Sequence, residues 1–558
     1  MNLLKVDMSK SRVTIEPYPF PPESLVAGRA FIDYWMNEFI SPTVHPLSEG
    51  NVLIIAPGLL AGTNAPTSGR LSVGGKSPLT GGIKEANVGG TAGNKLGRLG
   101  VQGIVVEGKA KDWQILRLDP QGAALEPAGD ILDLDNYTAC ERLRQRYGDK
   151  VAINITGPAG ERKYSNSTVA VTDVEGRPCR HAARGGVGAI MGSKLLKAIV
   201  IDDTGTSFRK PSDNEAFGAA VKATVETIKS NHYYELMHHM GTPGIIDIDH
   251  ARGSLQTRNL RRGDFENFQN INANKLIELN NVRGGSVGHG CMPGCIIQCS
   301  NIFNGPDGRY VTASLEFETL TMLGANLGID DLDAIARMDR KCDGLGLDTI
   351  ETGATIGILN DIGLFEFGDA SRAEALIEEI GKGSPMGRIL GNGVEMAAKI
   401  FGIDRVPAVK GQAIPAHSAR AAKGWGVTYA TSPQGADHTA GAVTQEHLSP
   451  LGQVERSRTS QIVNTAFDVT GLCHLTFLFR NTEPIMPLIN AFYGMNLTLE
   501  DFMEKGKEML RQERAFNINA GIGPASDRLP DWMRCEPLPP TNAVFDVSQE
   551  EIDTFFDF

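Results

Sequence analysis

The sequence predicts an α+β protein in which a β-rich N-terminal domain is followed by two mainly α-helical domains. Three observations lead to this prediction. The first part of the chain contains short apolar runs bounded by Gly, Pro or polar residues, as β-strands are. From about residue 213 onward, apolar residues recur at helical spacing. Polar or Pro-marked strips lie between these regions and indicate linkers.

The elements follow in order along the chain. The expected strands include 51–56, 103–107 and 197–201. A polar strip at 202–211 ends the β-rich part, and the helical segments after it include 214–230, 334–342 and 373–380. A second strip lies at 406–415, and the mostly helical last third ends in a Pro-rich tail at 537–540. We therefore expect domains at 1–205, 206–408 and 409–558, and we see no internal repeat.

The composition excludes several classes of protein. The chain has 558 residues, of which 41% are hydrophobic and 22% charged, as in an ordinary multi-domain globular protein. A net charge of −12 argues against a nucleic-acid partner, which would need basic patches. Neither an apolar run of transmembrane length nor a signal-peptide core is present, so we expect no membrane insertion and a cytoplasmic location. In a reducing compartment, clustered cysteines indicate metal or redox chemistry.

The sharpest chemical signal is a cysteine loop with Cys291, Cys295 and Cys299. Thiolates bind soft metals and iron–sulfur clusters, and a 4Fe–4S cluster takes four of them. On a straight helix the first and last of these residues would lie roughly 12 Å apart. Pro293 and Gly294 should break the helix and let the loop wrap around a cluster. A fourth ligand must come from elsewhere, and a zinc site or a set of buried thiols remains an alternative.

A hexapeptide pattern occurs twice. Asp343–Asp348 and Asp468–Cys473 both read Asp-x-x-Gly-Leu followed by Asp or Cys. The aspartate can accept two N–H bonds from a heterocycle with an amidine-like edge, and the glycine lets the backbone approach the ring. Either copy could instead be a helix that ends in a glycine cap. Cys473 is the candidate for the missing fourth thiolate, because it would join the cluster to the ligand of the second hexapeptide.

Gly-rich loops with arginines form a third signal in the first 200 or so residues. Such loops offer backbone N–H groups and guanidinium groups to phosphates. The segment 186–192 misses the dinucleotide fingerprint by one residue of spacing, and no P-loop motif occurs. Taken one by one, the loops could simply be turns between strands. They lie at 65–70, 76–80, 87–90 and 180–194.

Together these motifs resemble the tungsten-containing aldehyde:ferredoxin oxidoreductase family over almost the whole chain. The similarity is dense in 56–110, 157–199 and 316–353, and it returns in 426–438 and 468–473. Several long motifs in the order of the family make chance similarity improbable. The resemblance implies a β-rich N-terminal domain that binds tungsten (or molybdenum) held by two pyranopterins. It also implies one 4Fe–4S cluster and a Mg²⁺ ion that bridges the pterin phosphates.

The resemblance assigns roles to individual residues. One pterin would be held by Asp343 with Asp348, and the other by Asp468 with Leu472. Arg70 would lie between cluster and pterin, and the carbonyls of Asn87 and His181 would coordinate Mg²⁺. The phosphates would be lined by Arg180, Gly185, Gly186 and Gly188. The acid–base residues beside the metal would be Glu318 and His438, and the cluster ligands Cys291, Cys295, Cys299 and Cys473.

The implied reaction oxidises a small aldehyde to a carboxylic acid. Glu318 would act as general base on water, and His438 would donate to the carbonyl oxygen. Electrons would leave through the cluster to ferredoxin or a small iron–sulfur subunit, and a homodimer remains open. One alternative is a family relative that acts on a different carbonyl or on a thioester. Another is a cofactor-free scaffold or metal-storage subunit, in which Glu318 and His438 would be an ordinary helix-start carboxylate and a structural histidine.

The sequence departs from the family in three places. The cysteine spacing is three and three, where the family has two and three, so Cys299 could be a bystander and His289 a ligand. The nineteen residues from Cys299 to Glu318 match the family spacing and favour Cys299. A Glu-x-x-His metal site at the dimer interface of some members is replaced by Arg337-x-x-Arg340. The chain is also shorter than many members, and substrate preference usually lies in such trimmed loops.

Overall fold

The computed structural model describes residues 1–477 and 482–558. The N-terminal part forms two mixed six-stranded sheets. The first has the order β2-β1-β6-β3-β4-β5 and the second β11-β10-β9-β12-β7-β8. The strands of the first sheet are β1 Asn2–Asp7, β2 Arg12–Pro17, β3 Leu53–Pro57, β4 Leu71–Lys76, β5 Ile83–Val88 and β6 Val101–Glu107. Those of the second are β7 Gln114–Asp119, β8 Gly122–Pro127, β9 Ala152–Thr156, β10 Val169–Val171, β11 Arg180–Ala182 and β12 Leu196–Ile201.

The two sheets repeat one topology, although the sequence shows no internal repeat. β1 pairs with β6 in parallel, β7 pairs with β12 in parallel, and the remaining neighbours in both sheets are antiparallel. A short helix precedes each parallel partner: α2 (Ala92–Arg98) before β6 and α5 (Val187–Ser193) before β12. Asn87 lies opposite Ser72 on β5, and His181 lies opposite Ala170 on β11. Both stand one residue before the last pair of their ladders, so they occupy equivalent positions.

The two sheets share one apolar core. Strands such as β3, β9 and β12 are buried along their whole length, which explains why their sequences are continuous apolar runs and do not alternate. Leu53 and Ile55 of the first sheet pack in the same cluster as Leu116 and Ile199 of the second. The core therefore lies between the sheets and holds their edge strands, β5 and β11, next to each other.

The middle of the chain is mainly helical. Its core includes Leu320, Ile335 and Phe365, all fully buried, and Asp331 and Asp369 cap the N-termini of two of its helices. A small three-stranded sheet interrupts the helices with β13 Ser286–His289, β14 Ser300–Asn304 and β15 Tyr310–Ala313. The helices are α6 Asn214–Ser230, α7 His232–Met240, α8 Ile245–Arg252, α9 Ala273–Arg283, α10 Phe317–Met322, α11 Leu332–Leu345, α12 Thr349–Ile358, α13 Ala370–Lys382, α14 Pro385–Leu390 and α15 Val394–Phe401.

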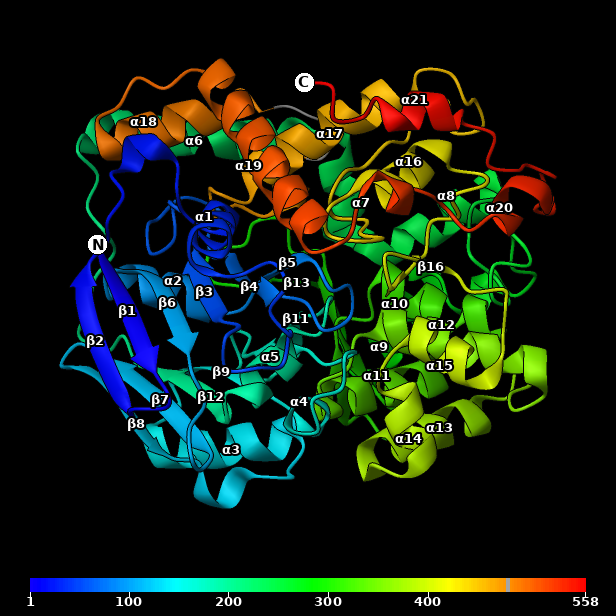
Figure 1. Ribbon diagram of the computed structural model, residues 1–558, viewed down its shortest axis with the longest axis horizontal. Helices are drawn as coiled ribbons and strands as arrows, with labels where there is room; N and C mark the ends of the chain where they lie inside the picture. Colours follow the sequence, from blue (N-terminus) through cyan, green and yellow to red (C-terminus); the bar gives the residue numbers. More distant parts are fainter. Residues whose placement is uncertain (478–481) are drawn as a thin grey trace.

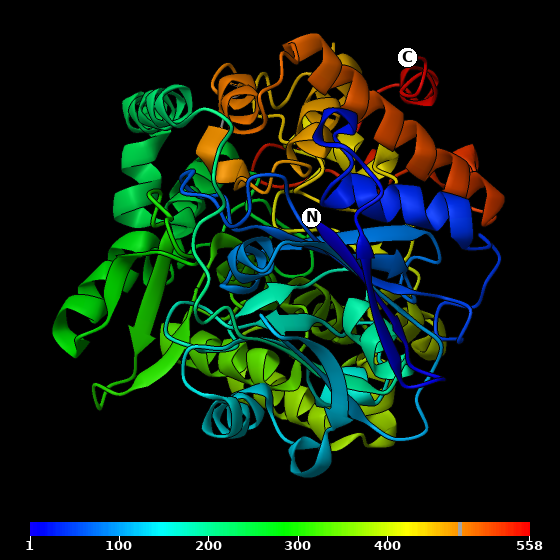
Figure 2. The ribbon, with the colours of Figure 1, turned by 90° about the vertical axis from the view of Figure 1, so that its left-hand side faces the viewer.

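The C-terminal helices lie across one end of the molecule (Figure 1). α6 packs on α18, and α17 packs on α19, so the first helix after the sheets belongs to this layer. Figure 2 shows α1 (Arg29–Phe39) beside α19, above the strands. The helices here are α16 Lys423–Thr431, α17 Gln453–Phe467, α18 Ile485–Tyr493, α19 Leu499–Asn519, α20 Trp532–Cys535 and α21 Gln549–Asp553. The remaining elements are α3 Asn136–Tyr147, α4 Pro158–Glu161, β16 Ala408–Val409 and β17 Gln412–Ala413.

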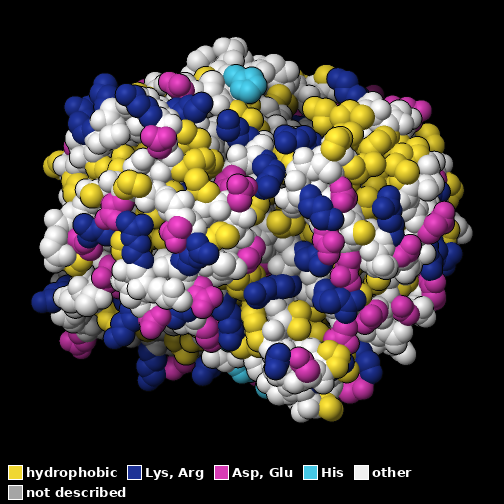
Figure 3. All heavy atoms as spheres, turned by 90° about the horizontal axis from the view of Figure 1, so that it is seen from below, with side chains coloured by type: hydrophobic (Ala, Val, Ile, Leu, Met, Phe, Trp, Pro, Cys, Tyr) yellow, Lys and Arg dark blue, Asp and Glu magenta, His cyan; other side chains and the backbone are white. Residues whose placement is uncertain are grey.

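These elements confirm the predicted α+β class with a β-rich N-terminal part and a helical remainder. The last strand of the two large sheets ends at Ile201, and α6 starts at Asn214. On the face seen in Figure 3, basic and acidic side chains are interspersed. Among the described residues, every helix is too short or too polar to cross a lipid bilayer.

Candidate active site

A cavity of about 610 Å³ lies where the edge strands β5 and β11 meet the helices. All three parts of the chain contribute to its wall. The sequence-predicted residues that line it are Arg70, Asn87, Arg180, His181, Cys291, Cys299, Glu318, Asp343, Asp348, His438 and Cys473. Six other predicted residues of the described ranges do not reach its surface: Gly185, Gly186, Gly188, Cys295, Asp468 and Leu472.

Glu318 and His438 face each other in this cavity. Glu318 lies in the first turn of α10, where the helix dipole favours its charge. One carboxylate oxygen, Oε2, accepts the backbone N–H of Ala416 at 2.8 Å. The other, Oε1, lies 3.8 Å from Nε2 of His438. Within the described residues, neither Glu318 Oε1 nor His438 Nδ1 has a hydrogen-bond partner, although both atoms are buried. In the part of the chain that the structure describes, the pair therefore offers one buried carboxylate oxygen and one buried ring nitrogen that lack a hydrogen-bond partner.

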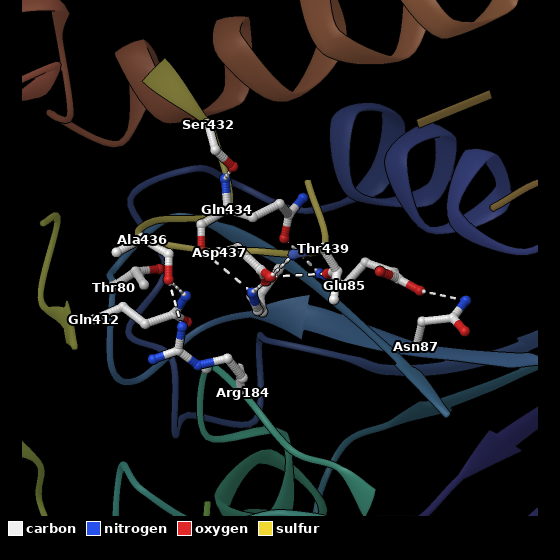
Figure 4. A network of polar contacts seen from close by, with 12 residues as sticks. Thr80, Glu85, Asn87, Arg184, Gln412, Ser432, Gln434, Ala436, Asp437 and Thr439 are labelled. Carbon is white, nitrogen blue, oxygen red and sulfur yellow. Dashed lines mark hydrogen bonds and ion pairs between the residues drawn. The ribbon is translucent and has the colours of Figure 1, made fainter. Parts of the chain in front are cut away.

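The loop that carries His438 is fixed by two cations from the sheets. The buried ammonium of Lys84 lies 2.8 Å from Asp437, the residue before His438. Burial alone would raise the pKa of the Asp437 carboxyl, but Lys84 holds it well below its usual range. Figure 4 shows Arg184 pointing at the carbonyl of Ala436, to which it donates. The edge strand β5 and the loop that follows the edge strand β11 thus set the position of His438.

A buried charge network lies beneath β5. Arg29 donates to both carboxylate oxygens of Glu513, at 2.7 and 2.9 Å, and to Asp468 at 3.1 Å. Gln434 joins Glu513 to β5, because its amide donates to the carboxylate and its carbonyl accepts from the backbone N–H of Glu85. Burial, followed by the charge of Asp468, raises the pKa of Glu85 to about 8. This carboxyl therefore tends to stay protonated at the cavity wall.

The first hexapeptide binds the second sheet with its acidic side chains. Asp343, near the end of α11, accepts the hydroxyl of Tyr137 at 2.8 Å and lies 2.9 Å from Nε2 of His181. Asp348 caps α12 through the N–H of Ile350 and accepts Nε of Arg184 at 3.2 Å. Both carboxylates line the cavity, so they stand where a ligand with N–H groups could meet them.

The backbone of the first hexapeptide rests on the loop after β9. A Cβ atom on Gly157 would lie 2.4 Å from the carbonyl oxygen of Leu345. Gly346 has a φ of +75°, a conformation that glycine adopts without strain. Its carbonyl accepts the N–H of Thr168 at 2.9 Å. Glycine is therefore required on both sides of this contact.

The second hexapeptide repeats the arrangement against the first sheet. Its backbone carbonyls at Val469 and Thr470 accept the N–H groups of Leu59 and Leu60 at 3.0 and 2.9 Å. A Cβ atom on Gly58, directly after β3, would lie 2.0 Å from the nitrogen of Gly471. The loops after β3 and β9, which are equivalent in the two sheets, thus each hold one hexapeptide.

The side chain of Asp468 is taken up by protein partners. Its carboxylate accepts Nη1 of Arg29 at 3.1 Å and lies 2.8 Å from Nε2 of His474. The amide of Asn87 approaches it at 3.4 Å. Burial would raise the pKa of Asp468, but His474 and Arg29 hold it below its usual value. Asp468 is therefore a buried anion behind the cavity wall, unlike Asp343.

The four predicted cluster cysteines lie near one another, and all but Cys295 line the cavity. The N–H of Thr67 donates to the carbonyl of Gly294 in the cysteine loop, and the carbonyl of Thr67 accepts the N–H of Cys473, both at 3.0 Å. Cys291 is tied to the first sheet, because its carbonyl accepts the N–H of Gly90 at 3.1 Å. A hydrogen bond from the Cys295 thiol lowers the pKa of Cys291 to about 6, against its burial and with help from Arg180 and Arg70. A thiolate is therefore favoured here.

Two arginines, Arg70 and Arg180, lie beside the cysteines. Arg70 donates from Nε to the side-chain oxygen of Asn87 at 2.6 Å. Arg180 donates to the hydroxyl of Ser314, and its Nη2 lies 3.4 Å from Nδ1 of His289. The other ring nitrogen of His289 lies 2.9 Å from the carboxylate of Glu175. Both nitrogens of His289 are thus engaged by protein groups.

The glycines of the 185–188 loop serve packing. Gly185 and Gly186 have positive φ angles of +83° and +74°. A Cβ atom on Gly188 would lie 2.3 Å from the carbonyl oxygen of Thr168. These residues let α5 start close against β10, and they stand behind the cavity wall.

Several wall residues were not identified from the sequence. His417 lies 2.6 Å from Asp249, and its ring stacks on Trp425 with centroids 4.5 Å apart. Arg252 of α8 completes this set. No motif marks them, because each contact joins distant parts of the chain; the helical spacing of 245, 248, 249 and 252 was the only available signal.

Comparison with known proteins follows the same division of the chain. Residues 3–203 match the family described as aldehyde ferredoxin oxidoreductase, N-terminal domain. Residues 219–557 match the family described as aldehyde ferredoxin oxidoreductase, domains 2 and 3. The chain is 31% identical to the tungsten-containing aldehyde ferredoxin oxidoreductase of Pyrococcus furiosus, over 96% of this chain and 91% of that protein. The protein of the same name from Thermococcus kodakarensis is 30% identical, with the same coverage.

More distant relatives have other names. An aliphatic sulfonate oxidoreductase, WOR-like subunit, from Pyrococcus furiosus is 25% identical over 93% of this chain and 86% of that protein. The active site complex BamBC of benzoyl coenzyme A reductase, solved with 1,5-dienoyl-CoA, has the same fold, with a TM-score of 0.84 and 19% identity. That comparison covers 100% of this chain and 93% of the other. The two family matches together span nearly the whole sequence. The chain therefore belongs to the aldehyde ferredoxin oxidoreductase family, a family of tungsten-containing oxidoreductases.

Proposed function

We propose that this protein oxidises an aldehyde to a carboxylic acid at a tungsten (or molybdenum) bis-pyranopterin centre. One 4Fe–4S cluster would pass the electrons to ferredoxin or a small iron–sulfur subunit. The observation that carries this proposal is the pair Glu318 and His438, which among the described residues offers an oxygen and a ring nitrogen without hydrogen-bond partners, in a cavity that thiols also line. Family membership supports the oxidoreductase class.

The residues fit a cofactor with two similar halves. Asp343 and Asp348 line the cavity beside the second sheet, where they would hold one pterin. Asp468 and Leu472 lie behind the wall, so the second pterin would contact this hexapeptide through its backbone or after Asp468 exchanges a partner. Asn87 and His181 occupy equivalent positions on β5 and β11, as two carbonyls that share one Mg²⁺ should. This equivalence supports a ligand that spans both edge strands.

The thiols fit an iron–sulfur cluster better than zinc. Cys291, Cys299 and Cys473 line the cavity, and Thr67 ties the cysteine loop to Cys473. Structural zinc sites are closed, whereas these thiols face an open cavity. His289 is engaged by Arg180 and Glu175, which favours Cys299 as the third local ligand. Arg70 would separate the cluster from the nearer pterin.

Glu318 and His438 would handle the protons. When bound, the metal supplies Lewis acidity and accepts the electron pair of the aldehyde. Glu318 Oε1 would take a proton from water, while the N–H of Ala416 holds the other oxygen in place. His438 would donate to the carbonyl oxygen, where negative charge develops. Lys84 and Arg184 keep its loop in position through Asp437 and Ala436.

The partners follow from the cysteine count. The four cysteines outside the proposed cluster site are scattered, at Cys140, Cys179, Cys342 and Cys535, so the electrons should pass to another protein. All eight cysteines are free thiols, as is usual in the reducing cytoplasm. We therefore propose a cytoplasmic protein and leave a homodimer open. We keep 1–205, 206–408 and 409–558 as the proposed domains.

A different substrate is the second candidate. The names of two relatives, an aliphatic sulfonate oxidoreductase subunit and a benzoyl coenzyme A reductase complex, show that members of this fold act on other compounds. The same cavity could therefore serve a different carbonyl or a thioester. A screen of aldehydes and thioesters with the anaerobically purified protein separates the two candidates.

Dye-linked aldehyde oxidation by Glu318→Gln and His438→Asn tests the proposed roles. Loss of an acid–base group typically costs 10²- to 10⁴-fold in rate, so we expect kcat to fall by about that factor in each variant. His239→Asn is the control, since this histidine is exposed and lies outside the cavity. Retention of wild-type activity by either site variant, at equal tungsten content, would remove that residue from the proposal.

A further inference from the structure

Beyond the Glu318–His438 pair, the cavity is bounded by one face of α8. Ile245, Ile248, Asp249 and Arg252 all line it, and their spacing of three and four residues places them on one side of the helix. The wall is apolar at the start of the helix and charged at its end. A ligand that lies along α8 would therefore contact the aliphatic side chains of Ile245 and Ile248 near the start of the helix and the charged side chains of Asp249 and Arg252 near its end.

His417 links the acid–base pair to α8. It directly follows Ala416, whose N–H binds Glu318. Asp249 holds its Nδ1 at 2.6 Å, and the ring stacks on Trp425 at 10° between planes. Burial lowers the pKa of His417, but the charges of Asp249 and Glu318 raise it above its usual value. His417 is thus an aromatic wall residue that Asp249 and Trp425 hold in one position.

Arg252 differs from His417 in this respect. It is half-buried and lines the cavity, and within residues 1–477 and 482–558 its side chain has no hydrogen bond or ion pair. Asp249, one turn earlier, is committed to His417. Burial and the charge of Arg252 lower the pKa of His447, which also lines the cavity. A guanidinium that is partly removed from water costs free energy unless an anion pairs with it.

We propose that Arg252 binds a carboxylate on the substrate, so that the preferred aldehyde carries a second, anionic group. The guanidinium can grip a carboxylate with two parallel N–H bonds. The flat wall of Trp425 and His417 would cover the carbon chain between the carboxylate and the aldehyde at Glu318. This inference rests on the proposed aldehyde oxidation, because it names the class of substrate for the same cavity.

Matched substrates test the assignment with the anaerobically purified holoenzyme. Dye-linked oxidation is compared for 4-oxobutanoate and butanal, and for 4-carboxybenzaldehyde and 4-methylbenzaldehyde. We expect the wild type to prefer the charged member of at least one pair. Arg252→Gln should raise KM for that member by roughly tenfold to a hundredfold, the usual value of a charge-assisted bidentate contact, and leave the neutral member unchanged. Arg252→Lys keeps the charge but cannot donate two parallel N–H bonds, so its KM for the charged member should lie between those of the wild type and Arg252→Gln.

A control variant and three contrary results make the role proposed for Arg252 testable. Arg309→Gln removes an exposed arginine and should change neither substrate. Equal effects of Arg252→Gln on both members of each pair, or a wild-type preference for the neutral members, would overturn the assignment. If the wild type prefers glyceraldehyde 3-phosphate over all the carboxylates, the anionic group that Arg252 binds is a phosphate, and the assignment of a carboxylate is wrong. If no aldehyde is oxidised, the proposed function fails; calorimetric titration with succinate and succinamide then decides on Arg252 alone, since only succinate should bind and only when Arg252 is present.

Discussion

At the residue scale, two side chains compete for one ligand position of the proposed cluster. The cysteine spacing leaves Cys299 and His289 as rivals, and both nitrogens of His289 lie beside protein groups. A neutral imidazole ligand would also have to displace Arg180 or Glu175. The thiol of Cys299 lines the cavity with Cys291. The contacts of the described residues thus favour the thiol.

Substitution of these residues separates the two ligand sets. Cys299→Ser and Cys473→Ala should each lose most of the iron and acid-labile sulfide, because a cluster with three thiolates is labile. His289→Ala should keep both, and Cys535→Ser, at an exposed cysteine, is the matched control. Iron and sulfide are measured per chain after anaerobic purification. An intact cluster in Cys299→Ser with a lost one in His289→Ala would reverse the assignment.

Glu351 makes stability depend on pH. It accepts the N–H groups of Val394 and Ala413, both at 2.8 Å, yet burial raises its pKa from 4.5 to about 7 despite Arg184. The folded chain therefore keeps a proton that the unfolded chain releases. The contribution of protonated Glu351 to the free energy of unfolding is complete below pH 4.5 and is lost as the pH rises through about 7. In full this is on the order of 3 kcal/mol.

The corresponding measurement is the thermal midpoint of unfolding at pH 5 and pH 8. Between these values, roughly the window set by the shift, the midpoint of the wild type should fall more than that of Glu351→Gln, which cannot ionise. Glu378→Gln, at a half-exposed carboxylate, should keep the slope of the wild type. Parallel slopes in wild type and Glu351→Gln would show that this carboxyl is already ionised at pH 5.

Sequence reasoning reached residues with marked chemistry and missed those that position them. Glu318, His438 and the four cysteines stand in recognisable motifs, and the fold brings most of them to one cavity. Lys84 and Asp437 are 353 positions apart, and Arg184 and Ala436 are 252 apart. No local pattern reports such pairs. Asp468 shows the reverse case, because its motif is clear but its carboxylate is bound by Arg29 and His474.

At the element scale, two equivalent loops hold the two hexapeptides. The loop after β3 contacts Gly471 through Gly58, and the loop after β9 contacts Leu345 through Gly157. Each contact brings two backbones together without a side chain between them. The two loops follow equivalent strands of two sheets with the same topology. The first hexapeptide should therefore lie relative to β11 as the second lies relative to β5. A ligand with two similar halves fits such a frame.

Gly157→Ala tests the importance of this docking. Gly157 has φ −80° and ψ −174°, which alanine adopts easily, so any cost is the clash with the Leu345 carbonyl. We expect a loss of roughly 1–3 kcal/mol, read as a lower thermal midpoint, together with a lower tungsten content. Gly218→Ala, inside α6 with free space around it, should instead stabilise by up to about 1 kcal/mol. Equal midpoints and metal contents for both variants would contradict the docking role.

The individual elements were easier to predict than their duplication. The expected strand 51–56 is β3 (Leu53–Pro57), and the expected helix 214–230 is α6. Apolar runs and helical periods are local, so they survive in the sequence. The repeat of the sheets does not, because β5 has six residues and β11 only three, and their side chains differ. Hydrogen-bond pairing preserves the topology while the side chains diverge.

At the scale of the whole molecule, the cavity exists only where three parts of the chain meet. The sheets supply Asn87 and His181, the middle helices supply Glu318 and Asp343, and the last part supplies His438. The α+β class and its order along the chain were predictable from composition and periodicity. The meeting of these parts was not, since it depends on long-range packing such as that of α1 on α19 and of α6 on α18.

Metal analysis of the full chain, purified without oxygen and measured by mass spectrometry together with its visible spectrum, tests the central claim most directly. The claim is that this cavity holds a tungsten or molybdenum bis-pterin centre beside one iron–sulfur cluster. We predict about one tungsten or molybdenum atom and about four iron atoms per chain, with the broad visible absorption of a cluster. A protein that is fully folded and free of both tungsten and molybdenum, or that holds zinc in place of iron, would contradict the account.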